Sequence, residues 1–181
     1  EVRKFKEDWA GHHRRFYQIG GITIQVDSDL PFTETTLQPA LSVFRVEGPG
    51  PDLIKVRHHF TLEGLDPLSP GEEISAQGPW TVYRKGGSWI YRCGQDETTY
   101  SLSVFNNEHT RGTIYHADDR IWRGGSLNTL SLPVTDQLLL TRLLADRGGC
   151  ILHSAAAIVD DKGFMFIGHS EAGKTTITRL L

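Results

Sequence analysis

The segment with the clearest chemical capacity lies near the end of the chain and has the pattern G-x-x-x-x-G-K-[ST]. Its residues are Gly168, His169, Ser170, Glu171, Ala172, Gly173, Lys174, Thr175 and Thr176. A loop of this kind turns successive backbone N–H groups inward to form an anion nest, and the helix that follows adds the positive end of its dipole. The pattern therefore predicts a site for a nucleoside triphosphate, ATP bound with Mg²⁺.

Two side chains of this loop are expected to contact the nucleotide or its metal ion. Lys174 is expected to bridge the β- and γ-phosphates as a point charge, which makes it our candidate catalytic residue. The hydroxyl of Thr175 is expected to ligate Mg²⁺, and it is the candidate metal ligand. Gly168 and Gly173 permit backbone torsions that are closed to other residues.

The elements around the loop must position these groups. The apolar run 164–167 predicts a strand that leads into the loop, and 174–181 reads as the opening of a helix. A second strand is expected within 150–159, and only the residues 160–163 connect the two. So short a connection joins antiparallel strands, because parallel strands need a crossover of a dozen residues or more.

Earlier in the chain, residues 16 to about 131 carry strand signals and almost no helical period. Two aromatic runs around Gly86-Gly87 predict a hairpin over 80–92. Further strands are expected at 41–46, 53–62, 100–105 and 113–116, and a Pro- and Gly-rich loop at 64–79. At 133–147 the period becomes helical, and Gly148-Gly149 ends the predicted helix.

These patterns predict an α+β protein with two domains. Residues 1–131 are expected to form a β-rich N-terminal domain. Residues 132–181 are expected to be the beginning of an α/β nucleotide-binding domain: its first strands, the phosphate loop and the helix start. Because five residues follow Thr176, we expect the chain to be a fragment that is catalytically incomplete, with its base beyond Leu181.

The composition limits the kinds of binding partner and the cellular location that we expect. The net charge of −3 argues against a nucleic-acid-binding surface. No apolar run approaches the roughly 20 residues that span a bilayer, so no membrane partner is expected. Cys93 and Cys150 are far apart and in no metal spacing, which favours a reducing compartment and a cytoplasmic protein.

Other titratable residues have plainer explanations. His153 precedes the loop-bearing strand and is a candidate for a hydrogen bond to the γ-phosphate, although a histidine among apolar neighbours is more often structural. The neighbours His58 and His59 would point to opposite faces of a strand and make a poor metal chelate. The pairs Asp118-Asp119 and Asp160-Asp161 occupy predicted turns.

The segment from Ile151 to Ala157, a short turn, an apolar strand and the loop Gly168–Thr176 together resemble the HPr serine kinase/phosphorylase catalytic domain and its kinase-like relatives. These share a fold lineage with phosphoenolpyruvate carboxykinase. The segment from Tyr17 to Ile22, which leads to Ser28–Pro31, is similar to the β-rich N-terminal region of such proteins. Thr176, where the bifunctional enzymes carry an acidic residue, favours a kinase-like relative.

The resemblance implies ATP-dependent phosphoryl transfer to a serine hydroxyl of a protein, a peptide or a small molecule. It matches Gly168, Gly173, Lys174 and Thr175 to phosphate and Mg²⁺ positions, and His153 to a histidine on the preceding strand. A homo-oligomer is suggested by analogy at the level of fold. The alternative is a non-catalytic sensor or adaptor that holds ATP without transferring phosphate.

Overall fold

The computed structural model describes residues 13–125, 127, 129–130 and 135–181. The chain divides into two compact units, the first ending at Leu139 and the second beginning at Leu140. The expected domain boundary between residues 131 and 132 lies outside the described residues, and so do the first two residues of the helix predicted at 133–147.

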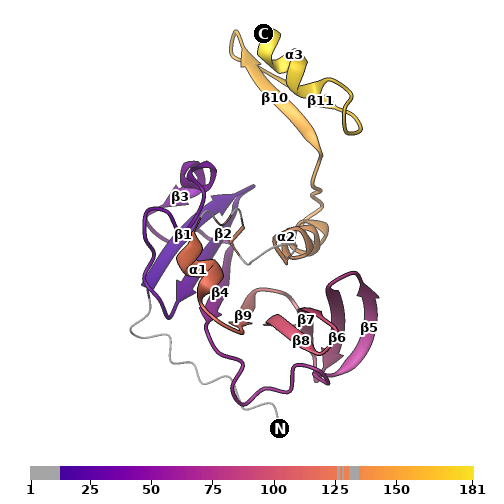
Figure 1. The fold of residues 1–181 in the computed structure, drawn as a ribbon. Coiled ribbons are helices and arrows are strands. Elements are labelled where there is room, and N and C mark those ends of the chain that lie inside the picture. Colours follow the sequence, from indigo (N-terminus) through magenta and orange to yellow (C-terminus); the bar gives the residue numbers. More distant parts are fainter. Residues whose placement is uncertain (1–12, 126, 128, 131–134) are drawn as a thin grey trace. The chain divides into compact units, whose positions relative to one another are not determined.

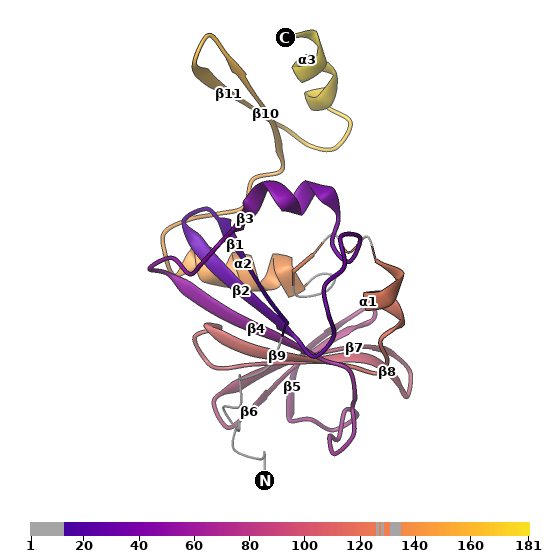
Figure 2. The ribbon, with the colours of Figure 1, turned by 90° about the vertical axis from the view of Figure 1, so that its left-hand side faces the viewer.

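The first unit is built on one nine-stranded sheet (Figure 1). Its strands are β1 (His13–Ile19), β2 (Ile22–Ser28), β3 (Arg45–Val46), β4 (Leu53–His59), β5 (Glu72–Gln77), β6 (Trp80–Lys85), β7 (Ser88–Gln95), β8 (Thr98–Phe105) and β9 (Arg111–His116). Their order across the sheet is β3-β1-β2-β4-β9-β8-β7-β6-β5, and the sheet twists along it (Figure 2). The helical segments are the 3-10 helix η1 (Pro39–Phe44), α1 (Arg120–Gly124) and α2 (Thr135–Ala145), of which α2 contains the division between the units.

Strand β4 gives the sheet its mixed character. It pairs in parallel with β2 on one edge, where Val56 lies beside Val26, and in parallel with β9 on the other, where Val56 lies beside Gly112. The remaining neighbours pair antiparallel. Ile54 and Val56 are fully buried, and every residue of β2 is buried as well. Burial on both faces is typical of a strand in the interior of a sheet.

Most of the expected strands of this unit are confirmed. The hairpin around Gly86-Gly87 is formed by β6 and β7, with Lys85 opposite Ser88. Gly86 and Gly87 have φ of +53° and +80°, the positive values that a tight two-residue hairpin turn requires at both positions. Strands β4, β8 and β9 fall where 53–62, 100–105 and 113–116 were expected.

Two expectations for the first unit are wrong. The segment 64–79, expected to be a loop, contains β5, and 41–46, expected to be a strand, is mostly the 3-10 helix η1. All of β5 is exposed, so its sequence shows no buried periodicity, and the strand exists through backbone pairing with β6, such as Glu72 opposite Arg84. Pro39 stands at the first position of η1, where its fixed φ suits a helical turn.

The second unit is a hairpin followed by a helix. Strands β10 (Ser154–Val159) and β11 (Lys162–Ile167) pair antiparallel, as the short connection predicted. Their turn has Asp160 and Asp161 at φ of +48° and +59°. Helix α3 (Lys174–Leu180) follows the loop and lies alongside the hairpin (Figure 1). The helix predicted at 133–147 is confirmed as α2.

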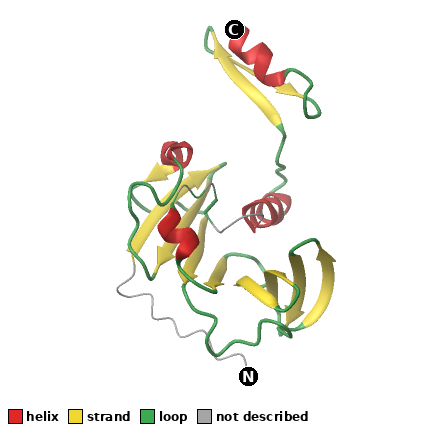
Figure 3. Cartoon of the chain, viewed as in Figure 1, coloured by secondary structure: helices red, strands yellow, loops and turns green. Residues whose placement is uncertain are grey.

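The expected fold class is wrong. We expected an α+β protein whose last 50 residues begin an α/β nucleotide-binding domain, but the part of the chain that the structure describes is mainly β, with 45% strand and 16% helix (Figure 3). The sheet that dominates it is mixed and lies in the first unit, whereas β10 and β11 form a separate two-stranded sheet. The helical period of α2 and α3 covers too few residues to outweigh the strands.

The close approach of Gly112 to Phe105 provides a test of the β8–β9 pairing. The two residues are cross-strand partners, and a Cβ added at Gly112 would lie 2.3 Å from the ring of the buried Phe105. We expect Gly112→Ala to lower the free energy of unfolding by about 1–3 kcal/mol, because the ring has to move. Gly48→Ala, whose Cβ meets nothing within 4 Å, is the control and should change it by less than about 0.5 kcal/mol. Equal urea midpoints for the two variants would contradict this packing.

Candidate functional site

The residues of the predicted phosphate loop connect β11 directly to α3. Gly173 has the left-handed conformation, with φ of +78° and ψ of 12°, and immediately precedes the first helical residue. Its carbonyl accepts the backbone N–H of Ile177 at 3.0 Å, which is the first bond of the helical ladder. The strand–loop–helix order that the motif requires is therefore present.

Lys174 folds back over the loop from the start of α3. Its Nζ donates to the carbonyl oxygen of Gly168 at 2.8 Å and to that of His169 at 2.7 Å. These two carbonyls belong to the beginning of the loop, so the ammonium bridges its two ends. The cationic group expected to contact phosphate is thus held at the loop by two charge-assisted hydrogen bonds.

The backbone between these ends turns sharply. Glu171 has φ of +67°, and the N–H of Ala172 donates to the carbonyl of His169 at 3.3 Å. A Cβ added at Gly168 would lie 3.2 Å from the Cβ of Ala172, closer than side chains normally pack. Left-handed residues among right-handed ones point successive N–H groups to the same side, which is the basis of an anion nest.

Two of the three hydroxyl residues of the motif, Thr175 and Thr176, lie in the first turn of α3. Thr175 and Thr176 are both exposed, and Ser170 is exposed in the loop. The ring nitrogen Nδ1 of His169 lies 2.5 Å from the carbonyl oxygen of Ser170, to which it donates. Thr175 is therefore accessible to a metal ion carried in with a nucleotide. In the described part of the chain, no group of three or more His, Cys, Asp or Glu side chains is placed to hold a metal ion.

His153 lies just before β10 rather than within it, and its side chain is exposed. Because Ser154 pairs with Ile167, the preceding residue reaches the level of Gly168, where the loop begins. The hairpin register thus brings the chain at His153 to the loop end of the sheet, the location that a contact with phosphate needs.

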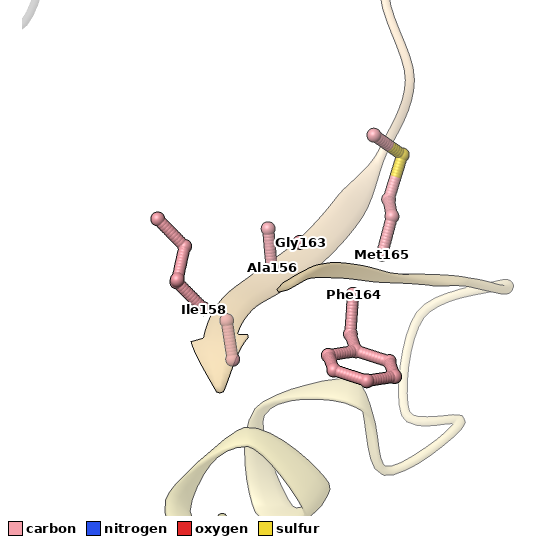
Figure 4. A pocket seen from close by; sticks show the side chains of 6 residues that line it. Ala156, Ile158, Gly163, Phe164 and Met165 are labelled. Carbon is pink, nitrogen blue, oxygen red and sulfur yellow. The ribbon is translucent and has the colours of Figure 1, made fainter. Parts of the chain in front are cut away.

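The hairpin also bears a shallow apolar hollow. It is lined by Ala156, Ala157, Ile158, Gly163, Phe164 and Met165 (Figure 4). Ile158 pairs with Gly163 beside the turn, so the hollow lies toward the opposite end of the hairpin from the phosphate loop. Its lining offers no polar side chain to a phosphate, and we assign it no part in nucleotide binding.

A cluster of three charged or titratable residues, Asp29, Arg57 and His59, lies in the first unit where the parallel strands end. We did not predict this cluster from the sequence. Asp29 follows β2, and His59 is the last residue of β4. The carboxylate of Asp29 accepts from Nη2 of Arg57 at 2.9 Å and contacts Nδ1 of His59. Parallel strands collect their carboxyl ends at one edge, but the sequence contains no signal that β2 and β4 are neighbours.

The two faces of β4 separate its adjacent histidines, as expected for neighbours on a strand. His59 is partly exposed beside Asp29 and Tyr115, with the rings of His59 and Tyr115 edge to face. His58 is buried on the other face, beside His116. The two imidazoles therefore lie on opposite faces of β4, as the alternation of side chains along a strand predicted.

The environment of Asp29 alters its acidity. Burial alone raises the pKa of this carboxyl, but hydrogen bonds from Arg57 and His59, together with the charges of these groups, lower the pKa below its ordinary value. The ionised carboxylate is therefore the form that the folded protein favours.

No protein-family model, curated protein or solved structure matches this chain. None of the described helices is both long enough and apolar enough to cross a membrane.

The effect of Arg57 on the pKa of Asp29 can be tested by titration. Arg57→Gln removes a hydrogen bond and a positive charge, so we expect the pKa of Asp29 to rise, as measured by carboxyl ¹³C NMR. A carboxyl whose pKa is lower in the folded than in the unfolded protein stabilises the fold at pH values above its unfolded-state pKa. This stabilisation is lost as the pH falls through its folded-state pKa. The variant should therefore lose this stability at higher pH than the wild type. Arg120→Gln, which affects the exposed partner of Asp118, is the control and should leave the Asp29 titration in place.

Proposed function

We propose that the loop Gly168–Thr176 binds ATP with Mg²⁺ and that the protein is an ATP-dependent serine kinase-like phosphotransferase. The acceptor is a hydroxyl of a protein, a peptide or a small molecule. The proposal rests on the motif and on the resemblance to kinase-like relatives of HPr serine kinase/phosphorylase.

The observation that supports it most directly is the position of Lys174. Its ammonium lies 2.7 and 2.8 Å from two carbonyl oxygens of a loop that has left-handed torsions at Glu171 and Gly173. An incoming β- or γ-phosphate oxygen offers this ammonium a full negative charge in place of a carbonyl dipole. The exchange favours the phosphate, because two opposite charges attract each other more strongly than a charge attracts a carbonyl dipole at the same distance.

The reaction follows the usual course of phosphoryl transfer. The acceptor oxygen attacks the γ-phosphorus, the bond from that phosphorus to the β–γ bridging oxygen breaks, and ADP leaves while the hydroxyl proton passes to a base. Lys174 would stabilise the charge that develops on the phosphate oxygens, and Thr175 would hold Mg²⁺ against them. His153 would donate a hydrogen bond to the γ-phosphate.

We also propose a cytoplasmic location. Cys93 and Cys150 are both free thiols, which persist in a reducing compartment. A homo-oligomer remains part of the proposal by analogy of fold, and neither a nucleic acid nor a membrane is proposed as a partner.

Calorimetric titration with Mg-ATP tests the binding step. We expect the wild type to bind and Lys174→Ala to lose at least about tenfold in affinity, since a charge-assisted hydrogen bond contributes about 1.5–3 kcal/mol. Lys162→Ala is the matched control, because this exposed lysine lies on the same hairpin at the end away from the loop. Equal affinities of the two variants would contradict the role of Lys174.

A phosphate-transfer assay on the full-length gene product, as wild type and as Lys174→Ala, separates the two function classes. ADP formation that a peptide, protein or small-molecule acceptor stimulates, and that Lys174→Ala abolishes, would support the kinase. Binding without turnover would favour the non-catalytic sensor or adaptor. Absence of binding in the wild type would contradict both.

A further inference from the structure

Two buried histidines face each other in the first unit. His58 of β4 and His116 of β9 are 1% and 4% exposed. Nδ1 of His58 lies 3.0 Å from Nε2 of His116, and the rings stack with centroids 5.3 Å apart. Trp122 lies against one ring and Phe60 against the other, at centroid distances of 4.9 and 5.0 Å. The pair is therefore enclosed by aromatic side chains.

The hydrogen bonds of the pair specify where its protons lie. Nε2 of His58 is 2.9 Å from the carbonyl oxygen of Leu130, which only accepts, so this nitrogen carries the proton. In the neutral ring, Nδ1 of His58 is then an acceptor, and Nε2 of His116 donates to it. If both rings are protonated, all four nitrogens carry protons, and two N–H groups point at each other across 3.0 Å. The doubly protonated pair cannot keep this arrangement.

The bond to Leu130 connects the sheet to the segment between α1 and α2. Leu130 is buried, and Leu127, three residues earlier, exchanges two backbone hydrogen bonds with the segment before η1. Its N–H donates to Thr36 at 3.0 Å, and its carbonyl accepts from Gln38 at 2.8 Å. Among the described residues of this stretch, Leu127 forms an isolated bridge with Leu37 and belongs to none of the nine strands.

The charged groups nearest the pair are already engaged with each other. From the end of β2 comes Asp29, which Arg57 and His59 of β4 hold. From the turn before α1 comes Asp118, which Arg120 holds. Carboxylates in ion pairs give less support to a buried imidazolium than unpaired ones would.

The acidities agree with this geometry. Burial lowers the pKa of His58 to about 4, against the hydrogen bond to Leu130 and the charge of Asp29, which raise it. Burial, followed by the charge of His58, lowers the pKa of His116 to about 3. A histidine whose folded-state pKa is lowered stabilises the closed form above its ordinary value of 6.5, and this stabilisation is lost as pH falls from there toward the folded value.

We propose that the stacked pair of His58 and His116 is an acid-sensitive latch that holds the backbone at Leu130, and with it Leu127, against the sheet and releases both when the rings take up protons. The release is local, because β4 and β9 stay in their ladders while the segment opens. The latch acts between about pH 6.5 and pH 4.

Amide hydrogen exchange of the full chain, measured by NMR between pH 7.5 and 5.0, tests this latch. Protection factors, which already correct for the intrinsic pH dependence of exchange, should fall at Leu127 and Gln38 by about ten- to a hundredfold per pH unit below 6.5, for one or two protons. The amide of Lys55, bonded to Thr110 at 2.9 Å beside the β4–β9 ladder, should stay protected.

Substitutions show which histidine takes up the protons that open the latch. His116→Gln keeps a donor toward His58 but does not titrate, so it should reduce the slope at Leu127 and Gln38. His13→Gln, at an exposed histidine of β1, should match the wild type. Protection that is independent of pH at Leu127 and Gln38 would overturn the proposal. A parallel loss of protection at the amide of Lys55 would also overturn it, because it would indicate global unfolding. This comparison is made in the wild type and does not require any variant to fold.

Discussion

Strand β4 pairs in parallel on both edges, and this double pairing joins two antiparallel groups of strands into one sheet. On one side stand β3, β1 and β2, and on the other β9 continues into the meander that ends at β5. Ile54 and Val56 on this strand are fully buried. Parallel neighbours need long connections, so these contacts join parts of the chain that are distant in sequence. Without β4, the two antiparallel groups would have no shared ladder.

The same pairing decides the environment of the polar residues at the strand ends. Because side chains alternate along a strand, His58 and His59 leave β4 on opposite faces. His59 contacts the carboxylate of Asp29, which Arg57 also holds, and its side chain is partly exposed. His58 meets a second imidazole and a backbone carbonyl in a buried setting that disfavours charge. Two adjacent residues of one type thus acquire different surroundings, one partly exposed and one buried.

The loop Gly168–Thr176 depends on contacts between residues that are close in sequence. Lys174 reaches carbonyls only five and six residues earlier, and the helix begins from the left-handed Gly173. The supporting strands β10 and β11 are joined by a short turn. All of these interactions are local, so the loop geometry follows from backbone torsions and near neighbours.

The sequence by itself determined the features that depend on local torsions: the hairpin at Gly86-Gly87, the antiparallel approach to Gly168, and helix α2. It did not reveal β5, whose exposed residues carry no buried period, nor the 3-10 helix at 39–44, and it led to the wrong fold class. Only the tertiary structure decided that β4 lies between β2 and β9 and that His58 faces His116. The physical reason is that strand order is set by the burial of whole faces over long sequence separations, which no local pattern encodes.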